Sequence, residues 1–204
     1  MAANPFATNC HLYVWAEGNF TGYRVSVQVR PSSVVPVFAW AGGFLTDGTF
    51  IQSGISQGTT TGYPYPWAFQ WAQEAPQTRT VNDPAPSWLP MQNAAVGAWY
   101  VFTGQLEGDG WHFYVTDPAG VRTQQGTHRS RALLRTVKFE AEPILDGTGW
   151  APFPTQAMRG AYARVGTTWA GASLWYSPIV TPTGSALVKR TAGPNLVFYW
   201  QSLT

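Results

Sequence analysis

Short apolar runs separated by turn residues follow one another from residue 34 to residue 74. The Asp47-Gly48 pair within this stretch is a strong hairpin signal, because a type I′ turn needs a positive φ at both central positions. Phe44-Leu45 and Phe50-Ile51 flank the pair, so we predict a β-hairpin there. The runs predicted as strands in this stretch are 37–40, 49–52 and 67–72.

Alternation of apolar and polar residues extends the strand pattern to the rest of the chain. In the run 23–30, Tyr23 and three valines alternate with Arg24 and other polar residues, which is typical of a half-buried strand. Glycine (21 residues) and proline (16 residues) are too dense for long helices. Further strands are predicted over 11–15, 95–102, 111–116, 137–142, 161–165, 172–176, 186–190 and 196–200.

Turns and one long loop separate these strands. Turns are predicted at 107–110, at 117–120 and near Gly126, and residues 76–90 are predicted as a long loop of functional interest. About eleven short strands without a helix indicate one all-β domain, a two-sheet antiparallel β-sandwich or a barrel, over residues 1–204.

The charge pattern excludes several kinds of partner. The formal net charge is +2, and the four arginines between 122 and 135 form only a loose group, expected to be a solvated surface. A nucleic-acid-binding protein has a denser basic footprint, so we expect no nucleic acid partner.

No run approaches the 20 apolar residues of a membrane-spanning helix, so we expect no membrane insertion. Residues 1–5 lack the basic and apolar regions of a signal peptide.

Few side chains could hold a metal ion or cofactor. Cys10 is the single cysteine, and His11, His112 and His128 are isolated in the sequence. No spacing of these residues matches a metal site, and no phosphate-binding or cofactor motif is present. We therefore expect neither a metal nor a cofactor.

Two carboxylates stand out from the other acids. Asp47, Asp109 and Asp117 lie in turn signatures, whereas Glu140 and Glu142 lie within the alternating run 137–142. Their spacing of two places both on one strand face, where mutual repulsion would raise one pKa and suit acid–base chemistry. The alternative is an exposed strand face shared with Lys138.

Polar and aromatic residues offer further candidates. Gln52 ends an apolar strand, where it either marks a site or merely closes the strand. The chain also contains 11 tryptophans, more than its core requires. Surplus tryptophan in a β-sandwich is typical of a groove that binds sugar or peptide.

These residues resemble the motifs of the fungal glutamic peptidases (eqolisins). That family has a strand with tryptophan, a Leu-Gln-Thr-Gly-Val-type strand with the catalytic glutamine, a Tyr-Glu-Trp-Tyr strand and a later strand with the catalytic glutamate. The matching residues, in the same order and within about residues 20–170, are Trp40, Ile51-Gln52-Ser53-Gly54-Ile55, Phe69-Gln70-Trp71 and Glu140.

The resemblance implies a concanavalin-like jelly roll, a polypeptide substrate, secretion and catalysis by Gln52 and Glu140, with Glu142 as the alternative base. The substrate-binding residues it implies are Trp40, Trp67, Gln70, Trp71 and Glu142. The chain departs from the family pattern at Ser56 and Gln70, where the family has acids, and its sequence pI is near 8.8.

A second hypothesis does not involve catalysis. A sandwich of the same architecture could bind glycans or peptides through a tryptophan-lined face or assemble with copies of itself. Geometry separates the hypotheses, because an enzyme must bring Gln52 and Glu140 within reach of one water molecule in an open groove. A Gln52 capped by the backbone and a Glu140 that faces bulk solvent would contradict catalysis.

Overall fold

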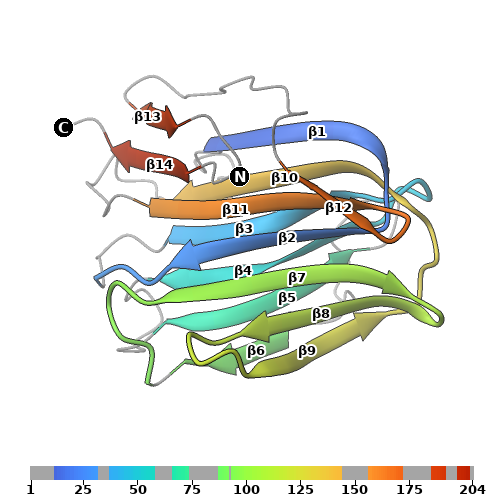
Figure 1. Cartoon of the computed structure of the whole chain (residues 1–204), viewed down its shortest axis with the longest axis horizontal. Coiled ribbons are helices and arrows are strands. Elements are labelled where there is room, and N and C mark those ends of the chain that lie inside the picture. Colours follow the sequence, from blue (N-terminus) through green and yellow to red (C-terminus); the bar gives the residue numbers. More distant parts are fainter. Residues whose placement is uncertain are drawn as a thin grey trace, which may run out of the picture.

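The computed structural model describes residues 12–31, 37–57, 66–73, 87–91, 93–143, 156–171, 185–191 and 197–202. This part of the chain forms 14 β-strands and no helix (Figure 1). It therefore contains no helix long and apolar enough to cross a membrane. The extent of the single domain, 1–204, stays a prediction.

One sheet has six strands in the order β1-β10-β3-β4-β5-β6, and every neighbouring pair is antiparallel. Its strands are β1 (Leu12–Phe20), β10 (Leu134–Pro143), β3 (Val37–Phe44), β4 (Phe50–Gln57), β5 (Trp67–Gln73) and β6 (Ser87–Pro90).

The other sheet has eight strands, seven of them in the order β13-β14-β11-β2-β7-β8-β9, with β12 also paired to β11. Its strands are β13 (Ser185–Thr191), β14 (Val197–Ser202), β11 (Gln156–Val165), β2 (Gly22–Gln28), β7 (Trp99–Glu107), β8 (Gly110–Thr116), β9 (Arg122–His128) and β12 (Thr168–Gly171).

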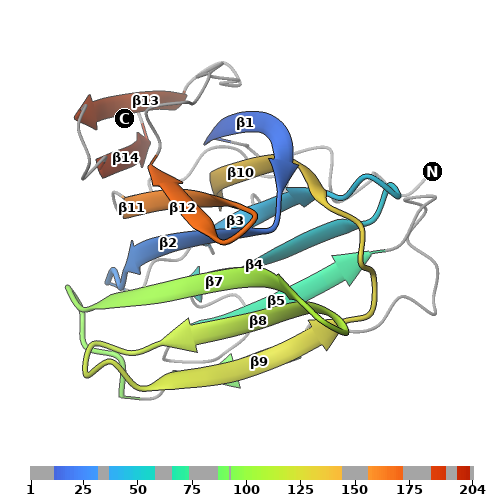
Figure 2. The same ribbon diagram turned by 45° about the vertical axis from the view of Figure 1, so that its right-hand side comes forward.

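The two sheets lie face to face and enclose the core (Figure 2). Alternation works as the sequence predicts: Tyr23, Val25 and Val27 of β2 are fully buried between the sheets, as are Val137 and Phe139 of β10. The predicted two-sheet antiparallel β-sandwich is confirmed.

The hairpin predicted around Asp47-Gly48 is present, with Phe44 paired to Phe50. The type I′ turn is wrong, because Gly48 has a φ of 88° whereas no described residue other than glycine has a positive φ. The Gly48 amide donates to the Leu45 carbonyl, and the Asp47 carboxylate accepts the Thr49 amide at 2.9 Å. Asp47 is thus the turn residue that the sequence predicts.

Some predicted boundaries need correction. Gly126 lies within β9 rather than in the predicted turn. The prediction failed because β9 is polar and largely exposed, so its sequence lacks the apolar alternation that identifies a strand. Ser87–Pro90 forms a strand at the sheet edge instead of ending the predicted loop. Residues 76–86 of that loop and the run 172–176 lie outside the described residues.

Buried hydrogen bonds join β4 to the other sheet. The hydroxyl groups of Tyr23 and Ser53 lie 2.9 Å apart, and both residues are fully buried. Farther along β4, the Gln57 side-chain amide donates to the Gln156 side-chain oxygen of β11 at 3.1 Å. Because unpaired buried polar groups are costly, these bonds hold β4 in one register.

Tyr23→Phe should lower the free energy of unfolding by about 1–3 kcal/mol, because the Ser53 hydroxyl would stay buried without a partner. Burial also raises the pKa of Tyr23 well above its ordinary value of 10.0. The raised pKa stabilises the fold below pH 10, and this contribution is lost as the pH rises further. Urea unfolding measures the free energy of unfolding near neutral pH and at about pH 11. Between these two conditions the free energy should fall less in the variant than in the parent.

A suitable control is Tyr162→Phe, because Tyr162 is only partly buried and no described residue bonds to its hydroxyl. We expect this change to alter the unfolding free energy by less than about 0.5 kcal/mol. Equal effects of the two substitutions would contradict the role of the Tyr23 hydroxyl.

Candidate functional site

Gln52 and Glu140 project from the same outer face of the six-stranded sheet. Ser53 points inward to Tyr23, so its neighbour Gln52 points outward. Phe139 and Ala141 lie in the core, so Glu140 between them also points outward. The structure therefore places the two predicted catalytic residues on one surface.

Strand pairing defines how the two residues lie relative to each other. Glu140 of β10 pairs with Trp40 of β3, and Gln52 of β4 pairs with Gly42 two residues farther along β3. β10 and β4 flank β3, so their Cα atoms are separated by two strand spacings and two residues, about 12 Å. Lys138 pairs with Gly42 and therefore lies in the same row as Gln52.

Both residues are shielded although they face outward. Glu140 is 1% exposed, Trp40 3% and Gln52 8%. The alternative of an exposed strand face is therefore wrong for Glu140. Glu140 has interaction partners, whereas within the described part of the chain the Gln52 amide group makes no side-chain hydrogen bond. The strand β4 continues from Gln52 to Gln57, so the alternative that Gln52 merely closes the strand is wrong.

Aromatic side chains line this face. The Trp40 and Phe50 rings meet edge-on with centroids 5.7 Å apart, and Phe44 lies 5.0 Å from Phe50. Phe38 and Phe69 form a second edge-on pair at 5.3 Å. The four phenylalanines were not predicted as site residues, because their strands carry apolar residues on both faces. The available signal was their even spacing from the predicted site residues Trp40, Gln52 and Trp71.

Gln70 does not belong to this face, contrary to the prediction. It pairs with the inward-facing Ser53 and is 9% exposed. A Cβ atom added to Gly126 of β9 would lie 2.5 Å from the Gln70 side-chain oxygen, so Gln70 occupies the space between the sheets. Its neighbour Phe69 faces outward instead, opposite Gly54.

The remaining predicted residues are placed by their backbones. Trp67 is half-buried and pairs with Ser56, on the outer face. Trp71 pairs with Gln52, and Glu142 pairs with Phe38, but both side chains lie outside the described residues. The roles assigned to Trp40, Trp67, Trp71 and Glu142 stay predictions.

Two glycines allow this face to close tightly. A Cβ atom at Gly54 would lie 2.2 Å from the Ala39 carbonyl oxygen and 2.7 Å from the Trp40 Cβ atom. At Gly42 the corresponding atom would lie 2.0 Å from the Ile51 carbonyl oxygen and 2.9 Å from the Gln52 Cβ atom. Each glycine thus lies directly opposite a predicted site residue on the neighbouring strand, where a larger residue would collide with it.

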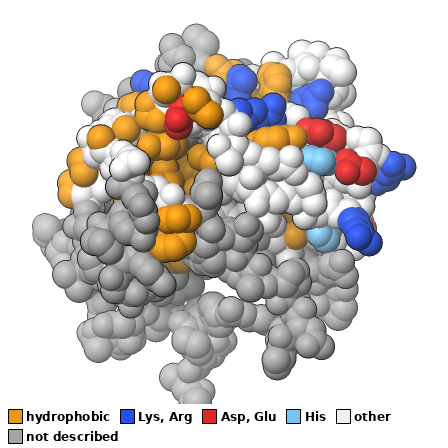
Figure 3. All heavy atoms as spheres, turned by 90° about the horizontal axis from the view of Figure 1, so that it is seen from below, with side chains coloured by type: hydrophobic (Ala, Val, Ile, Leu, Met, Phe, Trp, Pro, Cys, Tyr) orange, Lys and Arg blue, Asp and Glu red, His pale blue; other side chains and the backbone are white. Residues whose placement is uncertain are grey.

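No group of three or more metal-ligating side chains occurs among the described residues. A pocket of about 330 Å³ lies elsewhere, lined by residues including Met91, Tyr100 and Val121. Figure 3 views the molecule from the edge that carries β6 and β9. Hydrophobic side chains gather mainly on the left of this view, and charged and histidine side chains gather mainly on the right.

The charged group includes a cluster on the outer face of the eight-stranded sheet. His112 Nε2 lies 2.6 Å from an Asp109 carboxylate oxygen, and Glu107 accepts hydrogen bonds from Gln105 and Tyr114. The bond from Gln105, followed by that from Tyr114, lowers the pKa of Glu107. His112 is therefore not isolated in space, but the cluster engages its own members and contains no nucleophile.

The two-sheet sandwich defines the chain as an antiparallel all-β protein, and its particular fold is similar to that of the glutamic peptidases. A crystal structure of scytalido-glutamic peptidase with a peptide-based transition-state analogue superposes with a TM-score of 0.61 at 10% identity, covering 96% of this chain and 99% of that chain. A second, with a transition-state analogue inhibitor, gives 0.63 at 10% identity, covering 95% and 98%.

SCP-B, a member of the eqolisin family of peptidases, solved in a complex with the tripeptide Ala-Ile-His, gives a TM-score of 0.60 at 10% identity, covering 96% of this chain and 99% of that chain. No family model matches the sequence, and a comparison with curated proteins finds no match. The resemblance inferred from the motifs is thus confirmed at the level of the fold.

Gly54→Ala should destabilise the protein by about 1–3 kcal/mol, because the added methyl group meets β3 backbone rather than a side chain that can move. Gly108→Ala is the matched control, since nothing lies within 4 Å of the added atom. Chemical denaturation of both variants measures the difference. Equal stability of the two variants would show that Gly54 is not needed for close packing of β3 and β4.

Proposed function

We propose that the chain is a peptide hydrolase in which Glu140 is the general base and Gln52 stabilises the oxyanion. The main support for the proposal is the position of these two residues, which are far apart in the sequence. They share one face of the sheet on either side of β3, and both are shielded from solvent. The similarity of the fold to glutamic peptidases supports the proposal.

In the proposed reaction, Glu140 removes a proton from a water molecule as the water oxygen attacks the peptide carbonyl carbon. The carbonyl oxygen gains negative charge, and the Gln52 side-chain N–H group donates a hydrogen bond to it. Glu140 then returns the proton to the leaving amine nitrogen as the carbon–nitrogen bond breaks. No metal ion or cofactor takes part in these steps.

The strand geometry is compatible with this division of roles. A Cα separation of about 12 Å lets two long side chains lean toward each other with a water molecule and a carbonyl group between them. Gly42, which lies between Lys138 and Gln52, contributes no side chain to that space. Burial of the two groups strengthens the hydrogen bonds made in the transition state, because the surroundings are less polarisable than water.

The aromatic lining supports a polypeptide substrate. Trp40, Trp67, Trp71 and Glu142 are proposed to contact the substrate. The proposal includes action outside the cell, as the resemblance implies. Assay of the culture medium and the cell lysate of an expressing host tests this location.

Hydrolysis of unfolded casein between about pH 2 and pH 8 tests the proposed reaction. Glu140→Gln should lower the rate by about 100-fold or more, because the amide cannot accept the proton from water. Gln52→Ala should lower it by about 100-fold through loss of the oxyanion donor. Glu17→Gln is the control, because Glu17 is an exposed acid of the same sheet.

Circular dichroism must show that each variant keeps the parent fold. Loss of activity in Glu142→Gln with activity retained in Glu140→Gln would transfer the role of base to Glu142. An inactive parent at every pH would contradict the proposed reaction and favour a binding function for the tryptophan-lined face. Binding to a glycan and peptide array would then measure that function.

A further inference from the structure

Three arginines lie together on the outer face of the eight-stranded sheet, away from the candidate catalytic face. Arg24 belongs to β2, and Arg159 and Arg164 belong to β11, which pairs with β2. Arg159 is exposed, while Arg24 and Arg164 are half-buried. We call these residues, with Trp99, Tyr162 and Trp169, the arginine–aromatic patch.

A β-bulge brings these side chains to one face. Arg159 pairs with Ser26 and Tyr162 pairs with Arg24, so β11 has one residue more than β2 between these pairs. Gly160 lies in the extra segment with a φ of 58°, a conformation that favours glycine. Without the bulge, Arg159 and Arg164 would point to opposite faces, because their spacing is odd.

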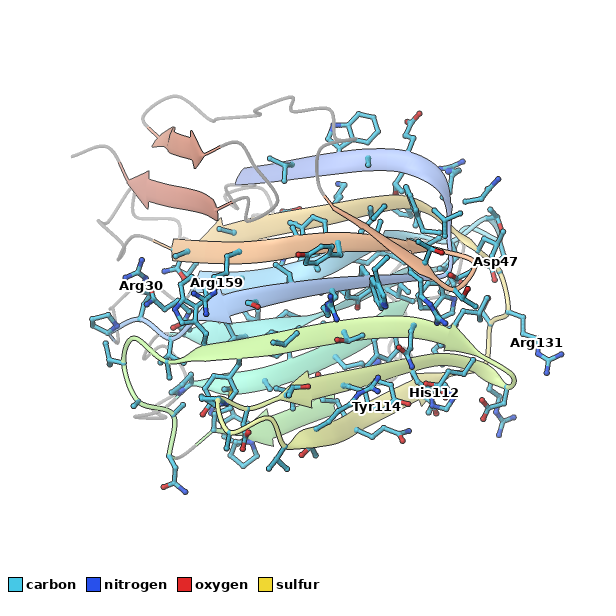
Figure 4. The ribbon with its side chains drawn as sticks, viewed as in Figure 1. Arg30, Asp47, His112, Tyr114, Arg131 and Arg159 are labelled. Atoms are coloured by element: carbon cyan, nitrogen blue, oxygen red, sulfur yellow. The ribbon has the colours of Figure 1, made fainter. Side chains whose placement is uncertain are left out.

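Aromatic rings hold the guanidinium groups in place. The Arg24 guanidinium carbon lies 4.9 Å from both the Tyr162 and the Trp169 ring centroids. Arg159 lies 4.1 Å above Trp99, and Arg164 lies 6.0 Å from Trp169. Cation–π contacts at these distances reduce the freedom of the side chains and are compatible with hydrogen bonds from the guanidinium edges. Figure 4 labels Arg159 on this sheet.

The positive charge of the patch is not matched by an acid in the part of the chain that the structure describes. Among the described residues, no carboxylate forms an ion pair with Arg24, Arg159 or Arg164, and the buried Arg164 Nε atom has no hydrogen-bond partner. Glu107 lies on the same sheet, but its carboxylate accepts bonds from Gln105 at 2.6 Å and Tyr114 at 2.7 Å. The patch is therefore complementary to an anionic ligand.

The arginines follow a regular spacing along the strands. Arg159, Arg24 and Arg164 lie at the levels of Ser26, Arg24 and Gly22 of β2, which are successive outward-facing positions. Each step along the strand is therefore two residues, or about 7 Å. Acidic side chains at alternate positions of an extended peptide have the same repeat.

We propose that the arginine–aromatic patch binds an acidic polypeptide segment in extended conformation, with Asp or Glu at alternate positions. Each carboxylate accepts hydrogen bonds from one guanidinium group, as Arg–carboxylate pairs commonly do. The rings already contact guanidinium groups, so base or sugar stacking is disfavoured relative to contacts at the guanidinium edges. This site is independent of the proposed hydrolase reaction on the other sheet.

Fluorescence anisotropy with a labelled peptide of alternating Glu and Thr tests the site at about 50 mM salt, where partly exposed charges are not fully screened. The comparison probe has the same composition with all Glu residues in one block. We expect the alternating peptide to bind about tenfold more tightly, since three matched pairs act together. Oligothymidylate and polygalacturonate of equal charge should bind more weakly than the alternating peptide.

Arg159→Gln should weaken binding of the alternating peptide by about threefold to fivefold, the effect of one partly exposed ion pair. It is the main variant because Arg159 is exposed and its loss does not disturb the core. Arg24→Lys keeps the charge and should also weaken binding, through loss of the planar fork. Arg135→Gln removes an equal charge from the other sheet and should leave binding unchanged.

Equal binding of the alternating and block peptides would overturn the proposal, because only net charge would then matter. Tighter binding of oligothymidylate or polygalacturonate would overturn it in favour of another class of polyanion. An equal loss in Arg135→Gln and Arg159→Gln would show that the patch is not the site.

Discussion

The buried hydrogen bond between Tyr23 and Ser53, together with the burial of Ile51 and Ile55, fixes which way β4 faces. It joins the two sheets through hydroxyl groups 2.9 Å apart, and no water competes for either group because both residues are fully buried. A shift of β4 by one residue would break this bond and turn Gln52 into the apolar core. The orientation of the candidate site thus depends on a contact made on the opposite face of the same strand.

Because successive side chains of a strand point to opposite faces, each sheet also has an outer surface, and the two outer surfaces of the sandwich differ. On the six-stranded sheet, Glu140 and Gln52 are shielded among aromatic side chains, where polar interactions are strong and water is scarce. On the eight-stranded sheet, Arg24 and Arg159 contact aromatic rings near solvent. The core separates the surfaces, so a ligand on one does not contact the residues of the other.

Alternation in the sequence predicted most of the strands, and the Asp47-Gly48 pair predicted the central hairpin. The shared face of Gln52 and Glu140 was a condition of the enzyme hypothesis, and the strand pairing meets it. The family resemblance assigned Gln70 to substrate binding, whereas its side chain lies between the sheets against Gly126. Alternation also missed the arginine–aromatic patch. Arg159 and Tyr162 have opposite parity in the sequence, and only the bulge at Gly160 places them on one face.

Gln70 is neutral and stands where the glutamic peptidase pattern has an acid. Its position in the structure shows that this difference lies away from the candidate catalytic surface. In this chain the residue fills the space between the sheets against Gly126, where a neutral amide costs less to bury than a carboxylate. Ser56 is different, because it pairs with Phe38 and Trp67 and lies on the outer face with Gln52. Of the two departures, only Ser56 alters the chemistry of the candidate catalytic surface.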